Sequence, residues 1–330
     1  MTQDVQQLDR TYIAATYARF PVELTHGKGS LVYDADGREY IDLSTGIAVN
    51  TFGFADEAWQ AAVTAQSGTL QHASNLYYSG PCAKLAAMLC EKTGMKKLFF
   101  SNSGAEANER AIKAARKYAA EKKGRGYYHI ITLQNSFHGR TITTLAATGQ
   151  DVFHRDFTPL TEGFHYAPAG DLAAIEQLID TYPTAAVMIE VVQGEGGVLP
   201  LDRGFVTALA DLLSARDVLL ICDEVQIGNG RSGSLYGYME YGIRPDIFTT
   251  AKGLGGGLPI GATVFGEKTA DVLTAGTHGS TFGGNPVCCA GAMSILSRLD
   301  DAVLAGVRER SSYIVQELAG APGIRSVTGL

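Results

Sequence analysis

Apolar and polar residues follow two different periods along most of this chain. From about residue 80 onward, the spacing of apolar residues predicts helices over residues 82–94, 104–124 and 203–217. Short apolar runs predict strands, and these runs cover residues 97–101, 128–134, 185–193, 218–224 and 247–252. Strands separated by helices are typical of a mostly parallel sheet with helices on both faces. The pattern therefore predicts an α/β fold.

The first 45 residues follow a different pattern. Apolar and polar residues alternate on both sides of "DADG" at residues 34–37. This alternation predicts two strands joined in a hairpin. We therefore expect the N-terminal segment to belong to a smaller unit beside the main sheet.

Composition narrows the class of protein. The chain has 330 residues, of which 45% are hydrophobic and 18% are charged, as in a globular protein with one large core. A net charge of -7 without blocks of like charge argues against nucleic acid or an anionic membrane as the main partner. Neither a leader-like start nor a long apolar stretch is present in the sequence, which predicts a cytoplasmic protein. Five cysteines without a C-x-x-C pair favour reduced thiols.

Lys252 is the first candidate for chemistry, because ligands of parallel sheets bind beyond the carboxyl ends of the strands. It ends the apolar run "IFTTAK" and precedes the glycine-rich "GLGGG". A lysine that is desolvated there loses basicity and becomes an amine nucleophile, able to form a Schiff base with a carbonyl. A pyridoxal-type cofactor would also need an acid for its ring nitrogen, a phosphate site and a stacking side chain.

Two further strand ends offer the acid and the phosphate site. Asp223 ends the run "VLLICD" and can hold a pyridine nitrogen protonated. The chain between Asp223 and Lys252 is long enough for one passage back to the same edge of the sheet. Residues 101–105, "SNSGA", join a predicted strand to a long helix, whose free N–H groups form a ready anion site.

A third strand end offers stacking and carboxylate recognition. Phe137, His138 and Arg140 follow the run "YHIITLQ" directly. An aromatic ring can cover one face of a cofactor, and an arginine binds a carboxylate through two parallel hydrogen bonds. Taken singly, Phe137 is better explained as a core residue and Arg140 as part of a surface ion pair. The evidence for a binding site is that Phe137, His138 and Arg140 occur together after one strand.

Other chemistries lack their signatures. Residues 261–269, "GATVFGEKT", miss the phosphate-binding pattern of nucleotide enzymes because Glu267 stands where a lysine is needed. Neither a dinucleotide fingerprint nor histidine spacing for a catalytic metal is present in the sequence, so we expect no metal.

Six ordered motifs carry a family resemblance: "SGAEANE", "SFHGRT", "QGEGGV", "DEVQIGNGRSG", "PDIFTTAKGLGGGLPIGA" and "HGSTFGGNP". Together they resemble the class-III pyridoxal-phosphate-dependent aminotransferases. The resemblance implies the PLP-dependent transferase fold of type I. It also implies a small domain begun by residues 1–45, a large cofactor-binding domain over residues 46–285, and a second part of the small domain from residue 286 to residue 330.

The resemblance also assigns roles to residues. Lys252 would form the Schiff base and then act as the base in proton transfer, and Asp223 would pair with the ring nitrogen. The remaining cofactor contacts implied are Ser103, Gly104, Ala105, Phe137, His138, Gln226 and, from a neighbouring subunit, Thr281. The substrate contacts implied are Arg140, Glu195, Ser280 and Tyr17. Glu195 would mask an arginine while the amino donor binds and swing away for 2-oxoglutarate. The sites would be shared across a homodimer.

The reaction implied is transfer of the terminal amine of N2-acetylornithine to 2-oxoglutarate, giving N-acetylglutamate 5-semialdehyde and glutamate in arginine biosynthesis. Related donors are the first alternative: ornithine, succinylornithine and 4-aminobutyrate. A PLP-dependent aminomutase is a second, disfavoured by the pair Arg140 and Glu195. A non-catalytic nucleotide-binding or interaction protein is a third, disfavoured by the presence of Lys252, Asp223 and Gln226 together. Because family members continue beyond "GIRSVTGL", we expect the small domain to be incomplete and the arginine partner of Glu195 to lie beyond residue 330.

Overall fold

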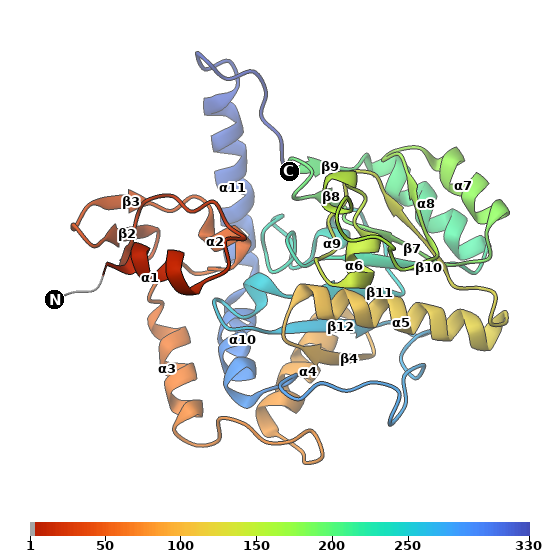
Figure 1. Cartoon of the computed structure of the whole chain (residues 1–330), viewed down its shortest axis with the longest axis horizontal. Coiled ribbons are helices and arrows are strands. Elements are labelled where there is room, and N and C mark those ends of the chain that lie inside the picture. Colours follow the sequence, from red (N-terminus) through yellow and green to blue (C-terminus); the bar gives the residue numbers. More distant parts are fainter. Residues whose placement is uncertain (1–3) are drawn as a thin grey trace.

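The computed structural model describes residues 4–330 and divides into a large α/β part and a smaller N-terminal sheet (Figure 1). The helices are α1 (Val5–Tyr12), α2 (Thr45–Ala48), α3 (Glu57–Ser67), α4 (Gly80–Thr93), α5 (Gly104–Lys122), α6 (Ile142–Ala147), η1 (Asp151–Phe153), α7 (Leu172–Thr181), α8 (Arg203–Ala215), α9 (Gly237–Glu240), η2 (Lys252–Leu254), α10 (Pro286–Arg298) and α11 (Asp301–Leu318). The strands are β1 (Leu24–Lys28), β2 (Leu31–Asp34), β3 (Glu39–Ile41), β4 (Lys97–Ser101), β5 (His129–Leu133), β6 (Phe164–Ala167), β7 (Thr184–Ile189), β8 (Val192–Gln193), β9 (Leu199–Pro200), β10 (Leu219–Asp223), β11 (Ile247–Thr250) and β12 (Gly261–Phe265).

The main sheet has seven strands in the order β4-β12-β11-β10-β7-β5-β6. Strands β11, β10, β7, β5 and β6 run parallel, and β12 is antiparallel to both of its neighbours, β11 and β4. The predicted α/β fold with a mostly parallel sheet is confirmed.

Strand β10 shows why its sequence is continuously apolar. Leu220 and Cys222 pack into one core cluster, with α8 and α10, while Leu219 and Ile221 pack into a second cluster, with α5. A strand with helices on both faces has no solvent side, so alternation disappears. The two layers fix the strand ends, where the polar residues of interest stand.

The N-terminal segment forms the separate antiparallel sheet β1-β2-β3. The hairpin predicted at residues 34–37 joins β2 to β3, and Asp34 Oδ1 stabilises the turn by accepting from the N–H groups of Asp36 (3.0 Å) and Arg38 (2.8 Å). Across residues 4–330 we find no helix that is both long and apolar enough to cross a bilayer.

One predicted strand differs from the structure. Residues 185–193 form two strands, β7 and β8, separated at Glu190 and Val191. Strand β7 pairs with β10 as far as Ile189, and the chain then turns away so that β8 pairs with β9. Its apolar sequence continues through the break because both strands are buried, which is why the pattern did not reveal it.

Candidate active site

Lys252 and Asp223 stand side by side at the carboxyl edge of the main sheet. Strands β10 and β11 are parallel neighbours, with Asp223 opposite Thr249, and Lys252 lies two residues after the end of β11. Both side chains line one cavity of about 650 Å³. The predicted single passage back to the same sheet edge is confirmed.

The backbone at Lys252 is held in an unusual conformation. Its φ of 43° lies in the left-handed region that side-chain-bearing residues rarely adopt. Hydrogen bonds fix both flanks: Asn229 Nδ2 donates to the carbonyl of Ala251 (3.2 Å), and Thr51 Oγ1 donates to the carbonyl of Gly253 (2.8 Å). The surroundings therefore determine where the amine points.

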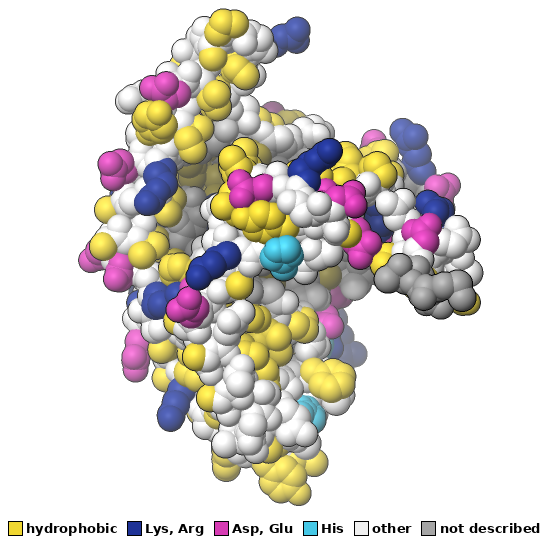
Figure 2. All heavy atoms as spheres, turned by 90° about the vertical axis from the view of Figure 1, so that its left-hand side faces the viewer, with side chains coloured by type: hydrophobic (Ala, Val, Ile, Leu, Met, Phe, Trp, Pro, Cys, Tyr) yellow, Lys and Arg dark blue, Asp and Glu magenta, His cyan; other side chains and the backbone are white. Residues whose placement is uncertain are grey.

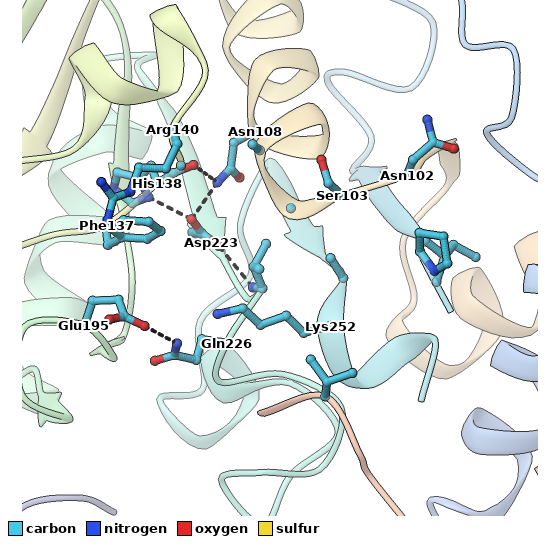
Figure 3. A pocket seen from close by; sticks show the side chains of 18 of the residues that line it. Asn102, Ser103, Asn108, Phe137, His138, Arg140, Glu195, Asp223, Gln226 and Lys252 are labelled. Atoms are coloured by element: carbon cyan, nitrogen blue, oxygen red, sulfur yellow. Dashed lines mark hydrogen bonds and ion pairs between the residues drawn. The ribbon is translucent and has the colours of Figure 1, made fainter. Parts of the chain in front are cut away.

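Burial lowers the pKa of the Lys252 amine, and Arg231 acts in the same direction. Asp223, Glu195 and Glu190 oppose the shift, because each carboxylate favours the charged amine. Burial outweighs them, so the neutral, nucleophilic amine is more accessible than in an ordinary lysine. The Lys252 side chain extends into the pocket on the side that carries Gln226 and Glu195 (Figure 3).

Asp223 is only 4% exposed and is held from several directions. Its Oδ2 accepts from Asn108 Nδ2 at 2.7 Å and lies 2.8 Å from His138 Nδ1, while Oδ1 accepts from the N–H of Val225 at 3.0 Å. Asn108 Nδ2 also donates to the carbonyl of His138 at 2.8 Å. This network fixes the orientation of the carboxylate toward the cavity (Figure 3).

The turn before α5 has the form of an anion site. Ser103 caps the 19-residue helix by accepting from the N–H of Glu106 at 3.2 Å, and Glu106 Oε2 accepts from the N–H of Asn102 at 2.7 Å. Ser103, Gly104 and Ala105 line the cavity at the positive end of the helix. A Cβ on Gly104 would lie 2.5 Å from Val225 Cγ1, so only glycine permits this approach.

Two further predicted groups meet in the same cavity. Phe137 and Arg140 line it, and the Arg140 guanidinium lies 4.1 Å from the centre of the Phe153 ring. On another wall, Gln226 Nε2 donates to Glu195 Oε1 at 2.9 Å. Gln226 and Glu195 are thus already linked to each other (Figure 3).

Three predicted residues lie toward the edge of this arrangement or outside it. Tyr17 lines the cavity but is 73% exposed. Ser280 stands behind the wall, where its Oγ accepts from Asn102 Nδ2 at 3.4 Å, and Thr281 is exposed. Neither Ser280 nor Thr281 lines the cavity of its own chain.

Two buried residues of the site escaped the sequence analysis, Asn108 and Glu190. Asn108 lies one helical turn after Gly104, on the side of α5 that faces Asp223, and this spacing was a signal that could have found it. Glu190 stands inside an apolar run, where a charged residue is unusual. Burial raises the pKa of Glu190 to about 7.

The family model described as aminotransferase class-III matches residues 12–324. The chain belongs to the class-III aminotransferases. This class-III aminotransferase is 50% identical to the acetylornithine aminotransferase of Haemophilus ducreyi, over 100% of this chain and 84% of that relative. It is 46% identical to the succinylornithine transaminase of Yersinia pseudotuberculosis, over 93% of this chain and 76% of the relative. The ornithine aminotransferase structure from Toxoplasma gondii matches with a TM-score of 0.93 and 33% identity, over 98% of this chain and 79% of that one.

The cofactor of this class-III aminotransferase is pyridoxal 5'-phosphate. The cavity fits that group in three respects. A buried amine of lowered pKa can meet the aldehyde, a fixed buried carboxylate can meet the ring nitrogen, and a helix start with room only for glycine can meet the phosphate.

Proposed function

We propose that this chain transfers the terminal amino group of N2-acetylornithine to 2-oxoglutarate, giving N-acetylglutamate 5-semialdehyde and glutamate as a step of arginine biosynthesis. The observation that carries the proposal is that Lys252, Asp223, Arg140 and Glu195 line one cavity. This set provides an amine, a fixed acid, an arginine suited to binding a carboxylate, and a second acid in the same cavity. The acetylated donor is favoured by the 50% identity to the Haemophilus ducreyi acetylornithine aminotransferase.

The chain would hold the cofactor through residues on every wall. Asp223 would bind the ring nitrogen, with His138 behind it, Phe137 would cover a ring face, and Gln226 would donate to the ring hydroxyl. The N–H groups at the start of α5, over residues 103–105, would hold the phosphate. When bound, the cofactor supplies an electron sink for the charge that develops on the substrate carbon next to the amine.

Lys252 would perform the proton transfer. Its Nζ takes a proton from the substrate carbon that carries the amine and later returns one, which requires an amine with a pKa brought closer to neutrality. Burial provides this shift. The hydrogen bonds beside Lys252 hold the backbone still during the exchange.

Arg140 and Glu195 would divide the work of recognition. Arg140 binds a carboxylate of the amino donor or of 2-oxoglutarate through its planar guanidinium. Glu195 adds negative charge where the donor has no carboxylate and would move away when the dicarboxylate arrives, which permits one pocket to accept both substrates. Ser280 and Tyr17 would contribute at the substrate entrance.

We further propose a cytoplasmic homodimer with shared sites. Thr281 is exposed and stands away from its own cavity, which suits contact with the cofactor phosphate of a second subunit. Large apolar side chains are exposed on the N-terminal part, including Phe20 (88%) and Leu43 (90%), and Figure 2 shows hydrophobic side chains across that face. Residues 1–45 and 286–330 would belong to one small domain and residues 46–285 to the large one.

The test is a comparison of amino donors. The purified protein, loaded with cofactor, is assayed for glutamate formation from 2-oxoglutarate with N-acetylornithine, N-succinylornithine, ornithine or 4-aminobutyrate. We expect kcat/KM for N-acetylornithine to exceed the others by about tenfold or more, a preference of about 1.4 kcal/mol. A higher value for ornithine or N-succinylornithine would reassign the donor.

A further inference from the structure

Glu190 is a buried carboxylate of the cavity wall that the proposed chemistry does not use. It is 5% exposed and lies at the break between β7 and β8. Its two oxygens accept from two different segments: Oε2 from the N–H of Phe137 at 2.9 Å, and Oε1 from the N–H of Gly194 at 3.3 Å. A buried carboxylate that bridges two backbone segments fixes their separation.

Both bridged segments carry proposed site residues. Phe137 would cover the cofactor ring, and Gly194 begins the short turn over residues 194–197 that presents Glu195. The N–H groups of Gly197 and Val198 return to the carbonyl of Gly194, at 3.2 and 3.1 Å, so the whole turn depends on where Gly194 is held.

The turn has a second anchor at its other side. Gln226 Nε2 donates to Glu195 Oε1, and a Cβ on Gly194 would lie 1.6 Å from Gln226 Oε1. The side chain of Gln226 therefore fills the space beside Gly194. Movement of Glu195 must break its hydrogen bond to Gln226. The hydrogen bond between the Gly194 N–H and Glu190 can remain, so Gly194 stays in place while Glu195 moves.

We propose that Glu190 is a positioning residue that holds the turn over residues 194–197 at a fixed distance from Phe137, so that Glu195 exchanges between donor and dicarboxylate positions about an anchored base. This inference rests on the proposed function, because it takes Glu195 as the group that distinguishes the two substrates. It adds a residue that sets specificity without touching the substrate.

The electrostatics of Glu190 give the anchor a pH dependence. Its pKa is raised to about 7, because burial and the charge of Asp223, which raise it, outweigh His138 and the two bound N–H groups, which lower it. Lys252 also faces it across the cavity. Above this pKa both oxygens accept charge-assisted bonds, whereas the protonated acid turns an O–H toward one of the N–H groups and loses that bond. The two hydrogen bonds that Glu190 accepts from Phe137 and Gly194 are therefore stronger above pH 7 than below it.

The experiment compares Glu190→Gln with the wild type, both loaded with cofactor. The amide keeps the size of the side chain but presents N–H₂ to one of the two backbone N–H groups. We expect backbone amide hydrogen exchange to accelerate by about tenfold in residues 191–198 and 134–140. We also expect the KM for 2-oxoglutarate to change at least about threefold relative to the KM for the amino donor, which corresponds to about 0.65 kcal/mol in one binding state.

Glu224→Gln is the matched control. Glu224 is also fully buried, burial raises its pKa to about 8, and it accepts from the N–H groups of Gly237 and Tyr238 at 2.7 Å each, but it does not line the cavity. Its variant should accelerate exchange near residues 236–240 and leave residues 191–198 protected. The proposal is overturned if both variants loosen the same segments, or if Glu190→Gln leaves residues 191–198 and the KM ratio unchanged.

A binding measurement separates this inference from the proposed function. Glutarate, a dicarboxylate that cannot be transaminated, is titrated into the wild type and Glu190→Gln between pH 6 and pH 8.5. We expect its Kd to depend on pH more steeply in the wild type; equal dependence in both proteins overturns the role of Glu190. Neither this titration nor the hydrogen exchange uses an amino donor, so a wild type that rejects N-acetylornithine would refute only the donor assignment.

Discussion

At the scale of single residues, the site depends on opposing effects at one amine. Three carboxylates favour the charged form of Lys252, and burial opposes them. Because burial is the largest cause, the amine is tuned toward the neutral form without losing the acids that orient the ligands.

Replacing Lys252 by alanine should abolish turnover and leave the fold intact. The amine is both attachment point and base, so we expect kcat to fall by about 10³-fold or more, the upper range for an acid–base group. Cofactor should be lost on dialysis while the melting temperature of the apoprotein is unchanged. The control is Lys268→Ala, which removes a partly exposed ion pair with Asp246 far from the cavity lining and should keep full activity. Retained turnover in Lys252→Ala would refute the assigned role.

Asn108→Ala tests whether the hydrogen bond from Asn108 orients the carboxylate of Asp223. Removing a donor to a buried carboxylate costs about 1.5–3 kcal/mol, so we expect cofactor affinity to weaken by about tenfold or more. The pH at which the absorption of the bound cofactor changes should also move, because the ring nitrogen loses a correctly oriented acid. A lower melting temperature with unaltered affinity and pH dependence would make Asn108 a purely structural residue.

At the scale of elements, strands β5 and β6 are joined by facing histidines at the edge of the main sheet. His129 Nδ1 lies 2.9 Å from His165 Nε2, and His165 stacks on Tyr182 with ring centres 3.7 Å apart. Burial lowers the pKa of both rings; Arg116 adds to the shift of His129, and His129 to that of His165. The fold therefore favours neutral rings.

The histidine pair predicts a pH dependence of stability. A histidine whose pKa is lowered by folding contributes fully to the stability of the protein above its pKa in the unfolded chain, which is near 6.5. This contribution is lost as the pH falls through the pKa of the folded state. Between pH 8 and pH 5 the melting temperature of the wild type should therefore fall more than that of His165→Gln. His26→Gln, which removes a histidine stacked on Tyr33, is the control and should follow the wild type. Equal falls in all three proteins would exclude the pair as a cause.

The sequence predicted the positions of helices and strands better than the contacts between residues that are distant in the chain. Apolar runs located β10 and β11, and the polar residues at or just beyond the ends of these runs are Asp223 and Lys252. It missed the break at Glu190, because a run buried on both faces shows no change of period where the chain leaves the sheet. It missed Asn108 because its importance arises from a contact with Asp223, which is distant in sequence.

At the scale of the whole molecule, the proposed shared site would make two chains interdependent. Thr281→Ala should weaken cofactor affinity by about tenfold or more, the effect of one charge-assisted bond to phosphate. In mixed dimers with Lys252→Ala, one site contains both Lys252 and Thr281 and should bind cofactor with normal affinity and turn over. Mixed dimers that bind no better than Thr281→Ala alone would show that Thr281 acts within its own chain.

The antiparallel strand β12 has a consequence for how the protein is made. It lies between β4 and β11, so the turn at residues 102–105 and Lys252 come together only when β12 has been inserted. The cavity is thus complete only after residues 261–265 have paired with β4 and β11, long after β4 and the turn at residues 102–105 have left the ribosome. During that interval β4 has no permanent partner in the main sheet, and folding must wait for a contact between distant parts of the chain. Cofactor capture can therefore report when synthesis of this domain has passed β12.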